Sequence, residues 1–268
     1  GNEGTTWESA FKSIPVGYTY LTANKNDVLH VAGGATAYAH TAILPWAKDY
    51  THMVGHTAPI KHGGRVRLTN TVTSATAGEY TISGTGCVFQ NIHWQFGDSA
   101  TATSLVGVAI SGNGRNAFIN CHFYGPFDAG IGAAIGQRML TVTSSQDNLF
   151  YGCSFGQRTI LNTSATGAIV SFNGSNNTNN FFEKCLFQMY NSNTASCAIN
   201  YVDGAMPGSG FTVFDDCIFN GSAGIAVADV IRYTTSSVGE TILKNCALTG
   251  AGLTVWATGA WKAVVNVC

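Results

Sequence analysis

The chain has 268 residues, of which 10% are charged and 32 are glycine, and its formal net charge is −1. About 25% of the residues of an average soluble protein are charged, so this composition is unusually poor in charge. The balanced charge argues against nucleic acid as a partner. No apolar run reaches the roughly 18 residues that a membrane-spanning helix needs, so no membrane insertion is expected.

Residues 1–26 are predicted to form an N-terminal cap region. Within it, residues 5–11 have the pattern of a short amphipathic helix, with Thr5 placed to cap it, Trp7 on its apolar face and Pro15 placed to end it. A helix here would cover the first exposed layer of a stack of strands.

Residues 27–86 are predicted to form irregular coils of a repeat fold. Short strand-like runs alternate with turns rich in Gly, Pro, Asn and Thr. The expected strands cover residues 27–34, 41–46, 50–54, 65–68 and 80–83. None of these runs is long enough for a convincing helix.

Residues 87–268 repeat with a period of 29 to 32 residues. The clearest unit is Phe-Ile-Asn-Cys-His-Phe at residues 118–123, and close copies begin at Phe150, Phe182 and Phe214. A second apolar run follows in each repeat, at residues 106–110, 139–142, 168–172, 197–201, 227–233 and 253–256. Polar segments of varied length, such as residues 173–180, separate the two. A fixed period of this size is typical of a solenoid, with variable loops between fixed strands.

Alignment of the repeats predicts ladders of inward-facing side chains at the first, fourth and sixth positions. These core residues are Phe118, Cys121, Phe123, Phe150, Cys153, Phe155, Phe182, Cys185, Phe187, Phe214, Cys217 and Phe219. The third position is expected to be a turn, where Asn tolerates unusual backbone angles. The cysteines are expected to be buried free thiols, because in-register strands hold equivalent Cβ atoms about 4.8 Å apart, whereas a disulfide needs about 3.8 Å.

These repeats resemble the right-handed parallel β-helices of the pectate-lyase-like superfamily. The Asn-Cys-x-Phe unit at residues 120–123, and the opening at residues 7–11 followed by residues 27–34, are similar to versions in bacteriophage virion proteins. The resemblance covers about residues 5–268 and implies an all-β, single-stranded right-handed parallel β-helix with a short N-terminal capping helix. Residues 264–268 begin another ladder strand, so we expect this end to be covered by another chain or by further residues.

Many β-helices that resemble this one cleave polysaccharides, and that chemistry needs clustered carboxylates. The weak catalytic candidates are Glu183, Asp215 and Asp216, which the repeat places in neighbouring coils. Lys184 would lie beside Asp216 and Lys244 beside Asp215, so a surface ladder of charges between coils explains the same residues. We favour the surface ladder and expect no catalytic site.

All seven histidines precede residue 123. His93 and His122 share one repeat position and are expected to stack one coil apart. Two imidazoles without a third ligand do not make a metal site, so neither a metal nor a cofactor is expected. If the two rings point outward, they would suit a pH-sensitive contact.

Trp256 and Trp261 near the C-terminus suit either a protein interface or a platform for stacking sugars. Tryptophan is enriched in interfaces, so we favour the interface.

The sequence therefore predicts a non-enzymatic structural protein of a bacteriophage virion, most simply a capsid-surface decoration protein that stabilises or adorns the particle. Its partners would be other virion proteins, in a homotrimer or embedded in the capsid, and its location would be the particle surface. The alternative is a tailspike-like or tail-fibre-like β-helix that binds or cleaves bacterial surface glycan as a lyase or hydrolase. A third hypothesis is a carbohydrate-binding module that uses exposed aromatic residues in the variable loops.

Overall fold

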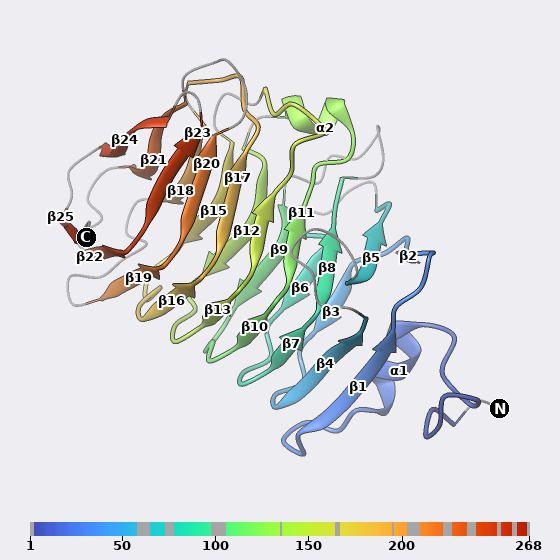
Figure 1. The fold of residues 1–268 in the computed structure, drawn as a ribbon. Helices are drawn as coiled ribbons and strands as arrows, with labels where there is room; N and C mark the ends of the chain where they lie inside the picture. The colour runs from blue at the N-terminus through green and yellow to red at the C-terminus, as the bar shows by residue number, and fades with distance from the viewer. Residues whose placement is uncertain are drawn as a thin grey trace.

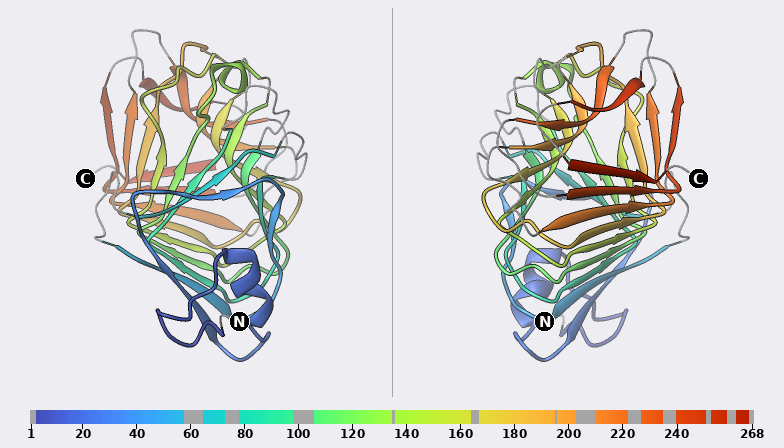
Figure 2. Two further views of the ribbon diagram at one scale, coloured as in Figure 1. Left: turned by 90° about the vertical axis from the view of Figure 1, so that its right-hand side faces the viewer. Right: turned by 90° about the vertical axis from the view of Figure 1, so that its left-hand side faces the viewer.

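The protein is a right-handed parallel β-helix built from three parallel sheets, as Figure 1 shows. The computed structural model describes residues 3–57, 65–72, 78–97, 106–134, 136–163, 167–194, 196–202, 210–221, 227–234, 240–250, 253–258 and 262–266. The predicted fold class is confirmed. Viewed from its two ends in Figure 2, the chain winds around a closed cross-section, and the sheets form its walls.

Each sheet takes one strand from each successive coil, and the order of strands follows the sequence. Sheet A contains β1 (Asp27–Ala32), β4 (Thr51–His56), β7 (Val88–Gln90), β10 (Ala117–Ile119), β13 (Leu149–Tyr151), β16 (Asn180–Glu183), β19 (Phe211–Asp215), β22 (Glu240–Lys244) and β25 (Lys262–Asn266). Sheet B contains β2 (Tyr38–His40), β5 (Val66–Asn70), β8 (Ile92–Gln95), β11 (His122–Tyr124), β14 (Ser154–Gly156), β17 (Leu186–Met189), β20 (Ile218–Gly221) and β23 (Ala247–Gly250). Sheet C contains β3 (Leu44–Trp46), β6 (Tyr80–Ile82), β9 (Val106–Ser111), β12 (Arg138–Thr143), β15 (Ala168–Asn173), β18 (Cys197–Tyr201), β21 (Val227–Tyr233) and β24 (Leu253–Thr258).

The repeated hexapeptide is a corner between two sheets. β10 ends at Ile119, Asn120 turns the chain with a φ of 50°, and β11 begins at His122. The residues at the same corner of other coils also have positive φ: Asn91, Gly152, Lys184, Asp216 and Asn245. The turn expected at the third position of the repeat is therefore present. The hexapeptide contributes to two strands rather than one, because the left-handed corner residue redirects the chain from sheet A to sheet B.

The core is built from stacked side chains of the hexapeptide. Phe118 stacks on Phe150 with ring centroids 4.9 Å apart, and Phe123 stacks on Phe155 at 4.7 Å. All twelve predicted ladder residues are at most 1% exposed. The cysteines of the described chain are free, and Cys153 donates a hydrogen bond from its thiol to the carbonyl oxygen of Phe118 at 3.2 Å.

A ladder of asparagines leads into the strands of sheet A. The backbone N–H of Asn116 donates to Oδ1 of Asn148 at 3.1 Å, and the backbone N–H of Asn148 donates to Oδ1 of Asn180 at 3.2 Å. These side chains are at most 1% exposed. The prediction of a purely exposed loop over residues 173–180 was wrong in part, because Asn177 and Asn180 are buried.

The N-terminal helix α1 spans Ile14–Tyr20 and lies beside β1 at the end of the stack (Figures 1 and 2). The predicted capping helix exists, but its expected position at residues 5–11 was wrong. Pro15 lies at the start of α1, where its missing N–H and fixed φ are tolerated, rather than after its end. Ile14 and Gly17 face inward and cover the first coil. A second short helix, α2 (Ala129–Ala133), follows β11 and is capped by Asp128.

Candidate functional site

The predicted catalytic candidates lie on the outer face of sheet A. Glu183 and Asp215 are paired in register on β16 and β19, and Asp215 is paired with Lys244 on β22. Lys244 Nζ is 2.7 Å from Asp215 Oδ2, so the expected ion pair between these coils is present. Asp216 is an exposed corner residue.

Lys184 contacts an aromatic side chain as well as lying near the carboxylates of Asp216 and Glu183. Its ammonium group lies over the ring of Tyr151, 5.3 Å from the centroid and 3.2 Å from the hydroxyl. The hydrogen bond with this hydroxyl raises the pKa of Lys184, with smaller contributions from Asp216 and Glu183. Glu183, Asp215 and Asp216 form, with their lysines, a row of charges on the surface between coils. None of these three acids lines either hollow described below.

The two tryptophans proposed as an interface fall at the edge of what the structure describes. Trp261 lies outside the described residues, and Trp256 belongs to β24 with only its backbone described. Their role stays a prediction.

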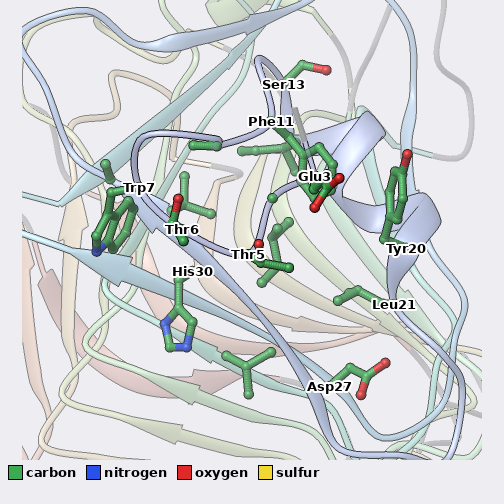
Figure 3. A pocket seen from close by; sticks show the side chains of 18 of the residues that line it. Glu3, Thr5, Thr6, Trp7, Phe11, Ser13, Tyr20, Leu21, Asp27 and His30 are labelled. Carbon is green, nitrogen blue, oxygen red and sulfur yellow. The ribbon is translucent and has the colours of Figure 1, made fainter. Parts of the chain in front are cut away.

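The N-terminal cleft is a hollow of about 660 Å³ between the segment before α1, the helix itself and β1 (Figure 3). Figure 3 shows Trp7 and His30 on one side of it and Tyr20, Leu21 and Asp27 on the other. The ring of Phe11 stacks on Tyr20 at 4.5 Å. Asp27 is already engaged, because it accepts the backbone N–H of Thr22 at 2.7 Å. The cleft therefore mainly marks the contact between the N-terminal cap and the first coil of the β-helix.

A second hollow lies on the outer face of sheet B and has a volume of about 500 Å³. We call it the histidine groove. Its described lining residues are Arg67, His93, Gln95, His122, Tyr124, Phe127, Arg158, Thr159 and Gln188. They come from β5, β8, β11 and β17, and from the segments that follow β11 and β14. The groove thus collects side chains that lie up to 121 residues apart in sequence, from Arg67 to Gln188.

Strand register builds the floor of the groove. His122 pairs with His93, and His93 pairs with Arg67, so the three side chains form one row across β11, β8 and β5. Because neighbours along a strand alternate between faces, Ile92 and Trp94 enter the core while His93 points outward. The imidazole rings of His93 and His122 lie 4.7 Å apart, as the repeat predicted.

Aromatic rings cover this floor from one side. The ring of Tyr124 lies 5.0 Å from that of His93 and 4.8 Å from that of His122, edge-on to both. Phe127 lies 4.8 Å from Tyr124. Tyr124 and Phe127 are half-buried, so each presents part of a ring to the groove.

Gly156 allows β14 to approach β17 closely beside the groove. It follows Tyr124 in the row of sheet B and has a φ of 94°, in the region that favours glycine. A Cβ atom at this position would lie 2.0 Å from the carbonyl oxygen of Gln188. His122 donates from Nε2 to the carbonyl oxygen of Gly156 at 3.1 Å, which fixes the orientation of the imidazole.

One buried glutamine organises the wall of the groove. The side-chain carbonyl of Gln157 accepts a hydrogen bond from the Thr159 hydroxyl at 2.7 Å and another from the Ile160 N–H at 2.7 Å. Its amide donates to the carbonyl oxygen of Pro126 at 3.3 Å. The segment that carries Arg158 and Thr159 is therefore tied to the segment that carries Phe127.

The electrostatic environment of the groove is positive. Arg67 and Arg158 are exposed at its walls, and none of its described lining residues is acidic. Arg65, which immediately precedes β5, is 3% exposed and donates from its guanidinium to the side-chain oxygen of Asn120 at 2.8 Å. Burial lowers the pKa of His93 to about 3, and the charges of Arg65 and Arg67 act in the same direction.

The described part of the chain contains no group of three or more His, Cys, Asp or Glu side chains arranged to hold a metal ion. None of its helices is long and apolar enough to cross a bilayer.

Sequence reasoning found the floor of the groove but not its walls. The shared repeat position of His93 and His122 predicted their stacking, whereas Arg67 belongs to an irregular coil that could not be aligned. Arg158 and Thr159 lie on a segment of variable length. The one usable signal was Gly156, a glycine at a strand position where other repeats carry side chains.

Taken together, fold and groove define a right-handed parallel β-helix with a polar, aromatic hollow on one outer face. No protein-family model matches the sequence, and no curated protein matches it significantly. Solved structures with the same fold include a pectin methylesterase in complex with a hexasaccharide, at a TM-score of 0.57 and 14% identity, covering 92% of this chain and 77% of that one.

The pectin methylesterase of Yersinia enterocolitica gives a TM-score of 0.52 at 10% identity and covers 93% of this chain and 95% of the enzyme. The pectin methylesterase PemA of Erwinia chrysanthemi gives 0.52 at 14% identity, with coverages of 94% and 78%. At these identities the similarity shows the parallel β-helix fold alone.

Proposed function

We propose that the protein binds a polysaccharide in the histidine groove without cleaving it. The observation that carries this proposal is the set of groups in one hollow: partly exposed rings of Tyr124 and Phe127, amides of Gln95 and Gln188, and guanidinium groups at the walls. Ligand sites typically combine apolar ring surface with a few placed polar groups. The pectin methylesterase crystallised with a hexasaccharide supports a sugar ligand for a protein of this shape.

Binding without hydrolysis follows from the chemistry of the lining. Glycoside hydrolysis uses an acid and a second carboxylate on either side of the scissile bond. The described lining residues supply no carboxylate, and Glu183, Asp215 and Asp216 lie on sheet A, on a different face. The described lining has donors and aromatic surface, but none of its residues could serve as the acid or the carboxylate nucleophile.

Affinity electrophoresis in gels that contain bacterial capsular polysaccharide or pectin tests this proposal. Wild-type protein is expected to be retarded, and Tyr124→Ala is expected to bind at least about tenfold more weakly, because ring surface buried against a ligand contributes about 1.5–3 kcal/mol. Tyr151→Ala is the matched control, since Tyr151 is an exposed tyrosine on sheet A. Unchanged retardation of Tyr124→Ala, or release of new reducing ends by the wild-type protein, would contradict the proposal.

A second candidate function is that of a structural protein on the surface of a bacteriophage particle. Its sequence support is the resemblance of the corner repeats to phage virion proteins. Its structural support is an apolar surface at the N-terminal end of the stack, where Trp7, Val16, Tyr20 and Val28 are 40–64% exposed. Contiguous exposed apolar surface often marks a protein interface.

Mass spectrometry of purified particles tests this second candidate, and a density map of the particle would show which end of the β-helix is covered. Analytical ultracentrifugation of the isolated protein would test the proposed homotrimer. A protein that is absent from purified particles would contradict the candidate, whereas its presence there is compatible with glycan binding by the same chain.

A further inference from the structure

His93 is an enclosed histidine whose hydrogen-bonding capacity is unused. Its side chain is 7% exposed, and neither ring nitrogen has a hydrogen-bond partner among the described residues. Buried polar groups in folded proteins are almost always paired, so an unpaired pair of nitrogens under a groove indicates a missing partner. His93 lines the histidine groove, so a bound ligand is a partner of the right location.

The groups around His93 determine what kind of ligand fits. Arg67 faces it from β5 in register, Arg65 lies at the start of the same strand, and His122 and Tyr124 face it from β11. No described lining residue is acidic. A neutral imidazole therefore lies among cationic side chains. An anion bound beside it would be attracted by all of these positive charges.

We propose that His93 and Arg67, with Arg158 at the opposite wall, form a subsite for an anionic substituent of the bound polysaccharide, and that binding this anion transfers one proton from solvent to His93. The inference rests on the proposed glycan binding and names the class of sugar. No covalent bond changes: imidazole becomes imidazolium, and the anion neutralises the added charge.

The sign of the pH dependence follows from linkage. Without ligand, His93 is neutral down to a pKa of about 3, because burial and the two arginines disfavour its charged form. A bound anion favours the charged form and raises this pKa. Between the free and the bound pKa, each fall of one pH unit strengthens binding up to tenfold for one proton taken up. Neutral ligands leave affinity independent of pH.

Calorimetry with three hexasaccharides tests the inference: a galacturonate hexamer, the same hexamer with its carboxyl groups reduced, and the reduced hexamer after sulfation. For wild-type protein we expect the galacturonate hexamer to bind at least about tenfold more tightly at pH 5.5 than at pH 7.5. Titrations in buffers of different ionisation enthalpy should show uptake of up to one proton. The sulfated hexamer distinguishes a subsite for any anion from one for carboxylate.

Two variants test which residues cause the pH dependence and the binding of the charged hexamers. His93→Phe keeps a ring against His122 and is expected to remove both the pH dependence and the proton uptake. Arg158→Gln should weaken binding of the charged hexamers and leave the reduced hexamer unaffected. His30→Phe, outside the groove, is the matched control. If His93→Phe does not fold, NMR titration of His93 in the wild-type protein gives the same answer, because bound galacturonate must raise its pKa.

The outcomes separate the two proposals. Equal affinity for the galacturonate and reduced hexamers at both pH values would overturn the anionic subsite and leave glycan binding standing. Failure of all three hexamers to bind would overturn the subsite and the proposed function together for this class of sugar. A pH dependence that persists in His93→Phe would assign the proton to another group and overturn the role of His93.

Discussion

The side-chain amide of Asn148 donates a 2.9 Å hydrogen bond to Oδ1 of Asn180 in the next coil, and both residues are fully buried. Asn180→Ala removes the acceptor for this amide and for the Asn148 backbone N–H. Leaving a buried donor unpaired costs about 1–3 kcal/mol, so we expect a loss of at least that size in the free energy of unfolding, measured in urea. Ser175→Ala, in the exposed part of the same segment, should cost about 0.5 kcal/mol or less. Equal stability of the two variants would show that the ladder is not structural.

The phenylalanine stack should be the most sensitive part of the core. Phe155 is fully buried between Phe123 and Phe187, with ring centroids 4.7 and 4.9 Å away. Phe155→Ala is expected to cost about 3–5 kcal/mol through lost burial and a cavity. Urea unfolding followed by circular dichroism measures this change. A cost below about 1 kcal/mol would mean that neighbouring coils collapse into the space.

The buried cysteines of the ladder should be unreactive towards thiol reagents in the native protein. Cys153 and Cys185 are at most 1% exposed, and burial raises the pKa of Cys197 to about 11. Since the thiolate is the reactive form, we expect an exposed-thiol reagent to label these three residues only after unfolding. Among the described cysteines, Cys246 is half-buried and is expected to react before the buried thiols. Peptide mapping by mass spectrometry resolves each site, and rapid native labelling of Cys153 would contradict the buried ladder.

Acid should destabilise the protein through His93. Its pKa in the folded state, about 3, lies below its ordinary value of 6.5, so protonation favours the unfolded state. The stabilising contribution of the neutral ring is complete above pH 6.5 and is lost as the pH falls toward 3, by about 1.4 kcal/mol per pH unit for one proton.

Unfolding free energies of wild-type protein and His93→Phe between pH 4 and pH 7 measure this contribution. The difference between the two should change with pH, and His30→Phe should not remove the dependence. Parallel curves for wild-type protein and His93→Phe would show that His93 does not titrate on unfolding in this range.

The acids of sheet A should be dispensable for any action on glycans. Asp215 is paired with an exposed lysine and Asp216 is an exposed corner residue. Asp215→Asn combined with Asp216→Asn is expected to leave binding in the histidine groove unchanged. Assays for reducing ends and for unsaturated uronate absorbance should detect no turnover with either protein. Turnover by the wild-type protein that the double variant lacks would return these residues to the active-site hypothesis.

The ladder residues were predictable because one period assigns equivalent positions in many coils. Phe118, Cys121 and Phe123 could be placed in the core without knowledge of the loops. The turn at Asn120 was predictable from its residue type, but the division of each coil among three sheets was not, because the period does not show that this turn separates strands of two different sheets. Pro15 was ambiguous for a similar reason: proline both follows helices and begins them.

The groove was harder to predict because its members obey no common period. His93 and His122 share a repeat position, but Arg158 and Thr159 reach the groove through hydrogen bonds to Gln157 that no spacing encodes. The burial of Asn180 could not be predicted from its neighbours, since residues 173–180 are almost wholly polar and such a segment is expected to be solvent-exposed.

The regular stacking of coils also sets a length scale for recognition. Adjacent strands of a sheet lie about 4.8 Å apart, which is close to the length of one sugar residue in an extended polysaccharide. A sugar polymer lying across β5, β8 and β11 would therefore meet one side chain of the row Arg67, His93 and His122 for each sugar residue. In the proposed glycan complex, the number of coils in sheet B, rather than the shape of any single loop, would determine how many sugar residues the protein contacts.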